Sequence, residues 1–465
     1  MSDLHWMTAT AAAAAIAKRE LSPVELTKAL LARIARLDPR LNAFIRLEAE
    51  MALDAARAAE MEAAQGRLRG PLHGVPVGVK DIIDVVGLPT TCHSKVLADA
   101  PAARADAECV TRLRAAGAIV LGKLSTHEFA IGGPSLDLPW PPARNPYNRD
   151  HHPGGSSSGS GSGLAAGFFP IALGTDTGGS VRNPASACAI VGLKPTYGLV
   201  SRRGVFPLSF TLDHVGPMTR TVADNALTLG VLAGHDPLDL GSVPSPRSVD
   251  YAGSLERGAR GLRIGFVRHF HETDMPADPE MAAGLERVAR TLASEGAEVI
   301  DVTLPPLEDF AAVNRVILQS EAWSIHAEWL RARPGDYGRL ARRRLMSGAF
   351  IGAGDYVLAS RQRSRMNGEV EALLRKVDIL LCASAMDPPC RIEEPETIER
   401  TYMRQARTPF NVTGHPALAM ATGLSRDGLP LAVQFIGRYF DEATVLRVAR
   451  AWERAAGTDA LHPPL

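Results

Sequence analysis

Residues 153–184 constrain the fold more than any other segment, because they hold two turns rich in glycine and serine on either side of an apolar segment. The first turn contains Ser156 within Gly-Gly-Ser-Ser-Ser-Gly, and the second contains Ser180 at the end of Asp-Thr-Gly-Gly-Ser. The segment between them, residues 164–173, predicts a short helix followed by a buried strand. A flexible linker can have this glycine and serine content, but it does not enclose a strand. The two turns are therefore predicted to lie at the ends of core elements.

A lysine lies upstream in an apolar run, where Lys80 is embedded in Val-Pro-Val-Gly-Val-Lys-Asp-Ile-Ile. A serine hydroxyl needs a base that takes its proton before it can attack a carbonyl carbon. Lysine serves as that base only when neutral, which requires a pKa about three units below its reference value. Burial in an apolar strand lowers the pKa, and an extended backbone would turn the neighbouring Asp81 to the opposite face. The lysine and the two serines indicate a hydrolase that activates serine without histidine.

Further motifs follow in order along most of the chain, and the whole set resembles the amidase signature family. Members of that family cleave or transfer carboxamides with a Ser–cis-Ser–Lys triad. Besides the two serine turns, the motifs that carry the resemblance are Gly74-Val-Pro-Val-Gly-Val-Lys-Asp, Glu128-Phe-Ala-Ile-Gly, Arg144-Asn-Pro, Gly192-Leu-Lys-Pro-Thr-Tyr-Gly, Asp213-His-Val-Gly-Pro-Met and Pro409-Phe-Asn-Val-Thr-Gly.

The resemblance implies a role for each member of the triad. Ser180 matches the nucleophile that forms the acyl-enzyme. Ser156 matches the bridging serine, whose peptide bond with Gly155 is cis in the family, and it would relay a proton between Ser180 and the base Lys80. Ser157 is expected to support Lys80 by hydrogen bonding.

The turn before Ser180 carries backbone N–H groups with little side-chain cover, as an oxyanion hole requires. Each such donor is worth about 3–4 kcal/mol of transition-state stabilisation. The expected donors are those of Thr177, Gly178, Gly179 and Ser180. Asp176 and Arg182 flank the turn and are expected to hold its shape.

The substrate pocket is less well specified by the sequence. By resemblance, the backbone carbonyl of Ala130 would bind the amide N–H of the substrate, and Ile131 lies beside it. Trp140, Trp323 and His326 are candidate walls. Two departures from the family pattern near the expected pocket leave the identity of the amide open, namely Ala421-Thr422-Gly423 and Cys382-Ala383-Ser384. A third, Ser158 in place of a common glycine, is a small change.

Short apolar strands alternate with helices after residue 70, which predicts an α/β fold. The expected strands are 75–79, 118–122, 170–174, 262–267, 297–302, 377–382, 417–421 and 431–436. Two N-terminal helices are expected, one from the capping box at Ser22 to about Leu37, closed by Asp38-Pro39, and one over 46–65.

The resemblance implies a single amidase domain over 1–465, an α/β/α arrangement with a central mixed, twisted sheet covered by helices. Residues 1–68 would wrap the core and provide dimer contacts. Residues 70–220 would form the signature core, and residues 235–400 the variable pocket region.

Composition narrows the class of protein. Lys and Arg number 51, as do Asp and Glu, so no net field favours nucleic acid or membrane partners. The five cysteines are scattered, which indicates reduced thiols, a cytoplasmic location and no disulfide framework. Residues 11–15 are predicted to be helix rather than a signal peptide, and no apolar window is long enough to span a membrane.

Three other patterns imitate known sites without meeting their requirements. Residues 155–159 fit G-x-S-x-G, but a loop rather than a strand precedes them. Residues 117–123 imitate a phosphate-binding loop, but Leu124 replaces the required Ser or Thr. The pairs His151-His152 and His269-Phe-His271 are interpreted as solvated loop histidines, since they lack acidic or cysteine partners at ligand spacing. No metal and no organic cofactor are expected.

The family also contains the A subunit of glutamyl-tRNA amidotransferase, in which the same triad releases ammonia from glutamine for a partner. That subunit carries a Tyr-Asp-Gly-Val-Arg-Tyr-Gly-like stretch, and the corresponding residues 340–350 lack it. The sequence therefore favours an amidase that works alone, as a homodimer, on a small-molecule carboxamide without nucleic acid. The amidotransferase is the alternative, and a non-catalytic scaffold is disfavoured because all three triad positions are present.

Overall fold

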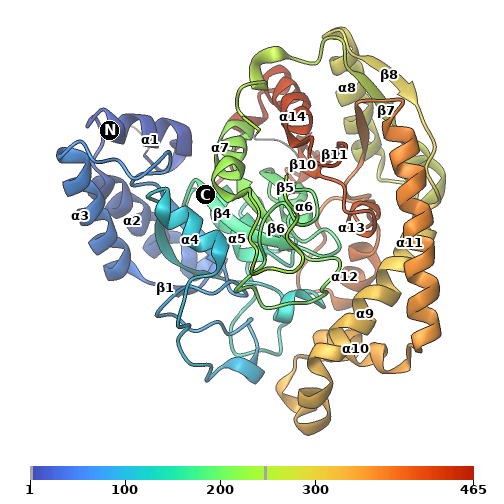
Figure 1. Ribbon diagram of the computed structural model, residues 1–465, viewed down its shortest axis with the longest axis horizontal. Helices are drawn as coiled ribbons and strands as arrows, with labels where there is room; N and C mark the ends of the chain where they lie inside the picture. Colours follow the sequence, from blue (N-terminus) through green and yellow to red (C-terminus); the bar gives the residue numbers. More distant parts are fainter. Residues whose placement is uncertain (1–3, 246–248) are drawn as a thin grey trace.

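The computed structural model describes residues 4–245 and 249–465, and its centre is a mixed sheet of eleven strands (Figure 1). β2 is parallel to β3 and β4, β7 is parallel to β8 and β9, and the remaining neighbours are antiparallel. In sheet order the strands are β1 (Phe44–Leu47), β3 (Ile119–Leu124), β2 (Pro76–Lys80), β4 (Ile171–Asp176), β6 (His214–Thr219), β5 (Val191–Lys194), β10 (Ala417–Leu424), β11 (Pro430–Ile436), β9 (Ile379–Ala383), β7 (Arg263–Phe266) and β8 (Glu298–Asp301).

Helices cover the sheet on both faces and extend beyond it at both ends (Figure 1). They are α1 (Ala9–Ala17), α2 (Pro23–Leu41), α3 (Ala49–Ala64), α4 (Glu108–Ala115), α5 (Ser158–Ala165), α6 (Arg182–Ala187), α7 (Val222–Leu232), α8 (Pro279–Ser294), α9 (Leu307–Ala332), α10 (Arg339–Met346), α11 (Ala353–Leu374), α12 (Pro395–Tyr402), α13 (Pro409–Val412) and α14 (Glu442–Ala456). The predicted α/β class is confirmed. None of these described helices combines the length and the apolar character that a bilayer crossing requires.

Alternating side chains of the strands supply two separate cores, because successive residues of a strand point to opposite faces. Ile171 and Leu173 of β4 pack in the larger core, to which α7, α8 and α14 also contribute, whereas Ala172 packs in a second core with α5 and α6. This arrangement places the two turns at residues 153–157 and 177–181 beside the second core, against the carboxyl ends of β2 and β4.

Each of the two predicted N-terminal helices departs from the sequence prediction at one boundary, the first at its end and the second at its start. α2 continues through Asp38-Pro39 to Leu41, because Leu37 and Leu41 are both buried and tertiary packing outweighs the proline stop signal. Residues 44–47 form the edge strand β1 rather than the start of a helix, since they pair with β3.

β5 and β6 were not predicted, because Gly192, Gly216 and Pro217 interrupt their apolar pattern.

Candidate active site

Lys80 ends β2 and is fully buried, as are Val77 and Val79 on the same strand. Its Nζ donates hydrogen bonds to Ser156 Oγ at 2.8 Å and to Thr175 Oγ1 at 2.7 Å. Burial lowers the pKa of Lys80 to about 7, although the carboxylates of Asp213 and Asp176 act in the opposite direction. A substantial fraction of this lysine is therefore neutral near pH 7, as a base for serine must be.

The carboxylate next to Lys80 in the sequence is neutralised by another residue. Asp81 forms a buried ion pair with Lys123 of β3, with 2.9 Å between Asp81 Oδ1 and Lys123 Nζ. Thr91 also donates its hydroxyl to the Asp81 carboxylate. The negative charge of Asp81 is thus compensated on its own side of β2, and it does not hold Lys80 in the charged form.

Ser156 is held in place through its backbone. The Gly155–Ser156 peptide bond is cis, and the Ser156 carbonyl accepts hydrogen bonds from the His127 N–H (3.0 Å) and the Thr126 hydroxyl (3.0 Å). These contacts hold the backbone of Ser156, and its hydroxyl accepts the hydrogen bond from Lys80.

Ser157 makes no hydrogen bond to Lys80 among the described residues, so the expected hydrogen bond between them is absent. The Ser157 hydroxyl instead bonds both the backbone carbonyl (3.3 Å) and the backbone N–H (3.2 Å) of Thr175. Thr175 is the residue that reaches Lys80. Ser157 therefore acts on the lysine only through Thr175, whose role could not be predicted because no motif marks it.

The two serine turns meet directly. The Ser157 N–H donates to the Ser180 carbonyl at 3.2 Å, and Ser180 itself is partly exposed and lines a cavity. Glycine permits close packing here: a Cβ on Gly154 would lie 2.7 Å from the Asn183 carbonyl oxygen, one on Gly159 2.2 Å from the Ala43 carbonyl oxygen, and one on Gly163 2.3 Å from the Phe169 ring. The serine- and glycine-rich run is helical from Ser158, as α5, because only small side chains fit between its neighbours.

Asp176 and Arg182 form a fully buried ion pair across the turn that ends at Ser180, with 2.9 Å between Oδ1 and Nη2. Burial alone would raise the pKa of Asp176, but the Arg182 guanidinium holds it far below its usual range. Asp176 also accepts the N–H of Gly179 (2.8 Å) and of Val181 (3.1 Å). Neither Asp176 nor Arg182 lines the cavity, and their expected role of holding the turn in shape stays a prediction.

The expected oxyanion donors are not equivalent in the structure. The Gly179 N–H is donated to Asp176. The N–H groups of Thr177, Gly178 and Ser180 make no hydrogen bond with the described residues, and all three residues line the cavity. Three of the four expected donors are therefore available to a ligand, and Gly179 is the exception.

The cavity at Ser180 has a volume of about 470 Å³ and is bounded by residues far apart in the chain. Ala130 and Ile131 line it, but Trp140, Trp323 and His326 do not; the His326 ring, for example, packs against Phe129 and bonds the Tyr337 hydroxyl. The walls that the sequence did not predict come from α9, α10 and the segment around α12, and they include Asn314, Arg315, Leu318, Arg343, Arg344, Tyr402 and Arg407.

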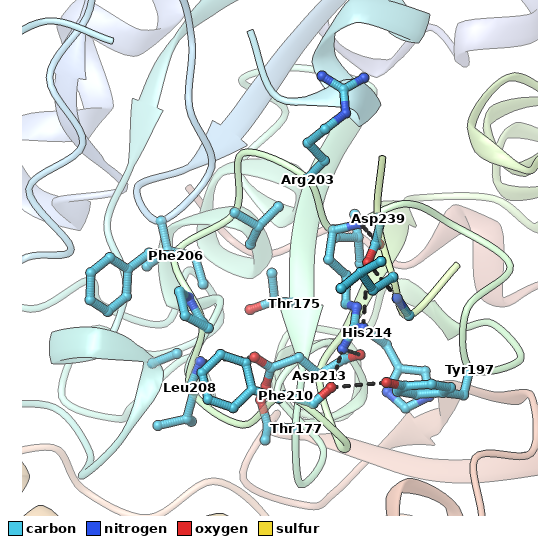
Figure 2. Close-up of a pocket in the computed structure, with 18 of the residues that line it drawn as sticks. Thr175, Thr177, Tyr197, Arg203, Phe206, Leu208, Phe210, Asp213, His214 and Asp239 are labelled. Atoms are coloured by element: carbon cyan, nitrogen blue, oxygen red, sulfur yellow. Dashed lines mark hydrogen bonds and ion pairs between the residues drawn. The ribbon is translucent and has the colours of Figure 1, made fainter. Parts of the chain in front are cut away.

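A second cavity of about 540 Å³ also borders the turn that ends at Ser180, through Thr177. Thr175 and Thr177 face it together with Asp213 and His214, and Phe206, Leu208 and Phe210 line it as well (Figure 2). The Thr177 hydroxyl donates to Asp213 at 2.6 Å. The two cavities share Ala130, Thr177 and Leu208 as lining residues.

The histidine pairs are less solvated than their loop sequences predict. His152 is buried, with a pKa lowered to about 4 by burial, and its Nδ1 accepts the Gly154 N–H. His271 is also buried and lies with Glu272 and Glu286 in a group close enough to hold a metal ion. Arg268, however, already forms ion pairs with both of these glutamates, so the group does not offer free carboxylates.

Comparisons with known proteins cover nearly the whole chain. A protein-family model described as Amidase matches residues 25–446. The chain is 39% identical, over 100% of its own length and 99% of the relative, to the A subunit of a glutamyl-tRNA(Gln) amidotransferase from Chloroflexus aggregans.

Solved structures agree with that match. A chain from a vestigial protein complex, described for the evolutionary origins of an s-triazine catabolic enzyme, superposes with a TM-score of 0.90, 35% identity and coverage of 96% of this chain and 98% of that one. A bacterial aryl acylamidase of the amidase signature family superposes with a TM-score of 0.90 at 25% identity, covering 99% and 100%.

These comparisons overturn the prediction of a homodimer that works alone without nucleic acid. A relative that matches from end to end is by name one subunit of an enzyme for glutamyl-tRNA(Gln). The prediction rested on one missing seven-residue stretch and on the balanced net charge, and identity over the full length outweighs both.

Proposed function

The chain belongs to the amidase family of carbon–nitrogen hydrolases, and on that premise we propose that it is the glutamine-hydrolysing component of a glutamyl-tRNA(Gln) amidotransferase. In this role it releases ammonia from the side-chain amide of glutamine for a partner subunit. The match to such a protein over the full chain supports this assignment. The single structural observation that carries the chemistry is a fully buried lysine, with a pKa of about 7, hydrogen-bonded to Ser156 beside the cavity of Ser180.

The reaction begins with a proton transfer. Ser180 Oγ attacks the amide carbon while its proton passes to Ser156, and Ser156 passes its own hydroxyl proton to neutral Lys80. The carbonyl oxygen becomes an oxyanion and accepts hydrogen bonds from the N–H groups of Thr177, Gly178 and Ser180, each worth about 3–4 kcal/mol.

The tetrahedral intermediate then collapses. The carbon–nitrogen bond breaks, the proton held by Lys80 returns through Ser156 to the departing nitrogen, and ammonia leaves an acyl-ester on Ser180. Water attacks this ester with Lys80 again acting as base, and the restored Ser180 hydroxyl completes the cycle.

Five cysteines, none of them in a disulfide, fit a reducing compartment, where such an enzyme would work.

The test is an assay of ammonia release from L-glutamine by the full chain, alone and with the remaining components of a bacterial glutamyl-tRNA(Gln) amidotransferase. We expect release in the presence of the partners and formation of glutaminyl-tRNA from glutamyl-tRNA(Gln), with Ser180→Ala inactive in both readouts. Turnover of other carboxamides with no release from glutamine in either arm would contradict the assignment to the amidotransferase and leave a hydrolase of another amide.

A further inference from the structure

The side chain of His127 lies against the first serine turn. The His127 N–H donates to the Ser156 carbonyl at 3.0 Å, and the His127 carbonyl accepts the Ala130 N–H at 2.8 Å. The ring packs on Gly155, where a Cβ would overlap the ring atoms Cε1 and Nε2. The ring is therefore held beside the peptide bond that precedes Ser156.

The hydrogen-bonding atoms of this ring are unused by the protein. No described residue bonds either ring nitrogen of His127, whereas His93 Nε2 bonds the Trp140 carbonyl and His152 Nδ1 accepts the Gly154 N–H. His127 is only 4% exposed, yet its ring nitrogens are not among the polar atoms sealed from solvent without a partner. The residue lines the Ser180 cavity and not the second cavity. Its ring nitrogens therefore open to the Ser180 cavity.

The ring of His127 is uncharged at neutral pH. Burial lowers its pKa well below the ordinary value, and the nearby charges of Lys80 and Arg344 act in the same direction. A neutral imidazole has one N–H donor and one unprotonated nitrogen that accepts a hydrogen bond, whereas an imidazolium has only donors. His127 therefore offers a ligand in the cavity a buried acceptor.

The departing nitrogen of the substrate has to lie near this acceptor. In the proposed reaction it takes its proton from Ser156, and the ring of His127 packs on the residue before that serine. The nitrogen of the tetrahedral intermediate receives this proton through its lone pair, so the lone pair points to Ser156 and both N–H bonds point elsewhere. An acceptor beside Ser156 can bind one of these N–H bonds and thereby hold the lone pair toward the relay.

We propose that the unprotonated ring nitrogen of His127 accepts an N–H of the substrate carboxamide and makes the site selective for primary amides. A substituent on the nitrogen would replace one of the two N–H bonds and meet the ring. No proton moves to or from His127, because the released ammonia carries its two original hydrogens and the one from Ser156. This inference deepens the proposed release of ammonia at Ser180 and rests on it.

The first experiment compares an amide with an ester of the same acid. L-Glutamine and the γ-methyl ester of L-glutamate share their acyl group, so contacts to that group cancel in the ratio of their kcat/KM values. The ester oxygen has no hydrogen to donate. With the full chain and its amidotransferase partners, we expect His127→Leu to lower kcat/KM for glutamine about tenfold and to change that for the ester less than about twofold.

Two further variants control this result. His127→Gln carries a carbonyl acceptor in place of the ring nitrogen and should restore part of the amide rate. His271→Leu is the matched control, because His271 is also a buried histidine but lines neither of the two cavities. It should leave the amide-to-ester ratio unchanged.

Selectivity is measured with γ-N-methyl-L-glutamine. The wild type should prefer glutamine to this secondary amide by about tenfold or more, since the methyl group removes one hydrogen bond and meets the ring. His127→Ala removes both the acceptor and the obstacle. We expect it to reduce the preference about tenfold.

A binding measurement tests the contact without turnover. Ser180→Ala keeps the ring of His127 but cannot be acylated. In protein labelled with 15N at its histidine rings, the His127 signal is the one lost when His127→Leu is added to Ser180→Ala. We expect the resonance of its unprotonated nitrogen to move upfield with saturating glutamine and to stay in place with the γ-methyl ester.

The outcomes separate this inference from the proposed function. Equal losses for glutamine and the ester in His127→Leu would show that the ring only supports the backbone at Gly155 and Ser156, and would overturn the inference while the hydrolase stands. An unmoved His127 resonance at saturating glutamine would overturn it as well. Hydrolysis of another carboxamide but not of glutamine would contradict the proposed function, and the same amide-to-ester ratio for that acid would still decide the role of His127.

Discussion

The Nζ of Lys80 donates a 2.8 Å hydrogen bond to the Oγ of Ser156, and neither side chain is exposed to solvent. The contact joins the end of β2 to the first serine turn. The second serine turn is joined to the first through the Ser157 N–H and the Ser180 carbonyl. Lys80, which is buried at the end of β2, is thereby linked to Ser180, which lies at the edge of a cavity.

Activity should rise with pH as Lys80 loses its proton. Burial lowers its pKa to about 7, so the neutral, active fraction grows from about one tenth at pH 6 to about nine tenths at pH 8. Lys80→Met should reduce kcat/KM by about a hundred- to ten-thousand-fold. Circular dichroism would verify that the variant is folded. Near-normal turnover by folded Lys80→Met would exclude Lys80 as the base.

Thr175→Val should alter the pH profile as well as the rate. The Thr175 hydroxyl accepts a hydrogen bond from Lys80 Nζ at 2.7 Å, and an acceptor favours the charged form of an amine. Removing it should shift the rising limb of kcat/KM to lower pH and reduce kcat, while Thr175→Ser should restore both. A lower kcat with an unmoved limb would indicate that Thr175 only maintains the local packing.

Ser180, and not Ser156, should carry the acyl group. Ser180 is partly exposed and lines the cavity, whereas Ser156 is fully buried and bonded to Lys80. A fluorophosphonate should modify Ser180 in the wild type and should modify neither serine in Ser180→Ala, as read by peptide mass spectrometry. Label found on Ser156 in that variant would reverse the two assignments.

The segments that hold Lys80, Ser156 and Ser180 could be found in the sequence because each is a short contiguous motif. The roles of the three residues came from the family resemblance, and they stay predictions. The alternation of strands and helices likewise predicted the fold class. In contrast, Thr175 reaches Lys80 only through the register of β4 against β2, which no local pattern specifies.

The pocket could not be predicted because packing brings distant residues to it. Arg344 and Arg407 lie in arginine-rich sequence that gives no sign of a cavity. Arg407 is buried and Arg344 is half-buried at the Ser180 cavity, because α10 and the segment after α12 pack there. A net charge of zero over the chain concealed the arginines of this cavity. For the same reason the balanced composition was a poor guide to partners, since an interface with another protein or with RNA depends on local surface.

Chelation of metal ions should leave turnover unchanged. The triad needs no metal, and the group of His271, Glu272 and Glu286 is occupied by the Arg268 guanidinium. We expect kcat/KM after dialysis against EDTA to equal that before it, and the exposed Glu272→Gln variant to behave as the wild type. A loss that a single divalent ion restores, together with a loss of activity in Glu272→Gln, would show that this group binds a metal that the reaction needs.

Arg182→Gln should strongly destabilise the protein. Arg182 and Asp176 are both fully buried, and removal of the guanidinium leaves a carboxylate without its counter-charge in the interior. Breaking a buried pair in this way costs about 3–5 kcal/mol in the free energy of unfolding. The matched control is Arg57→Gln, which breaks an ion pair with Asp54 whose side chains are 52% and 73% exposed, and this change should cost under about 0.5 kcal/mol. Urea denaturation at neutral pH measures both values. Equal, small losses would mean that other contacts of Asp176, such as those from Asn411 and the Gly179 N–H, neutralise its charge without Arg182.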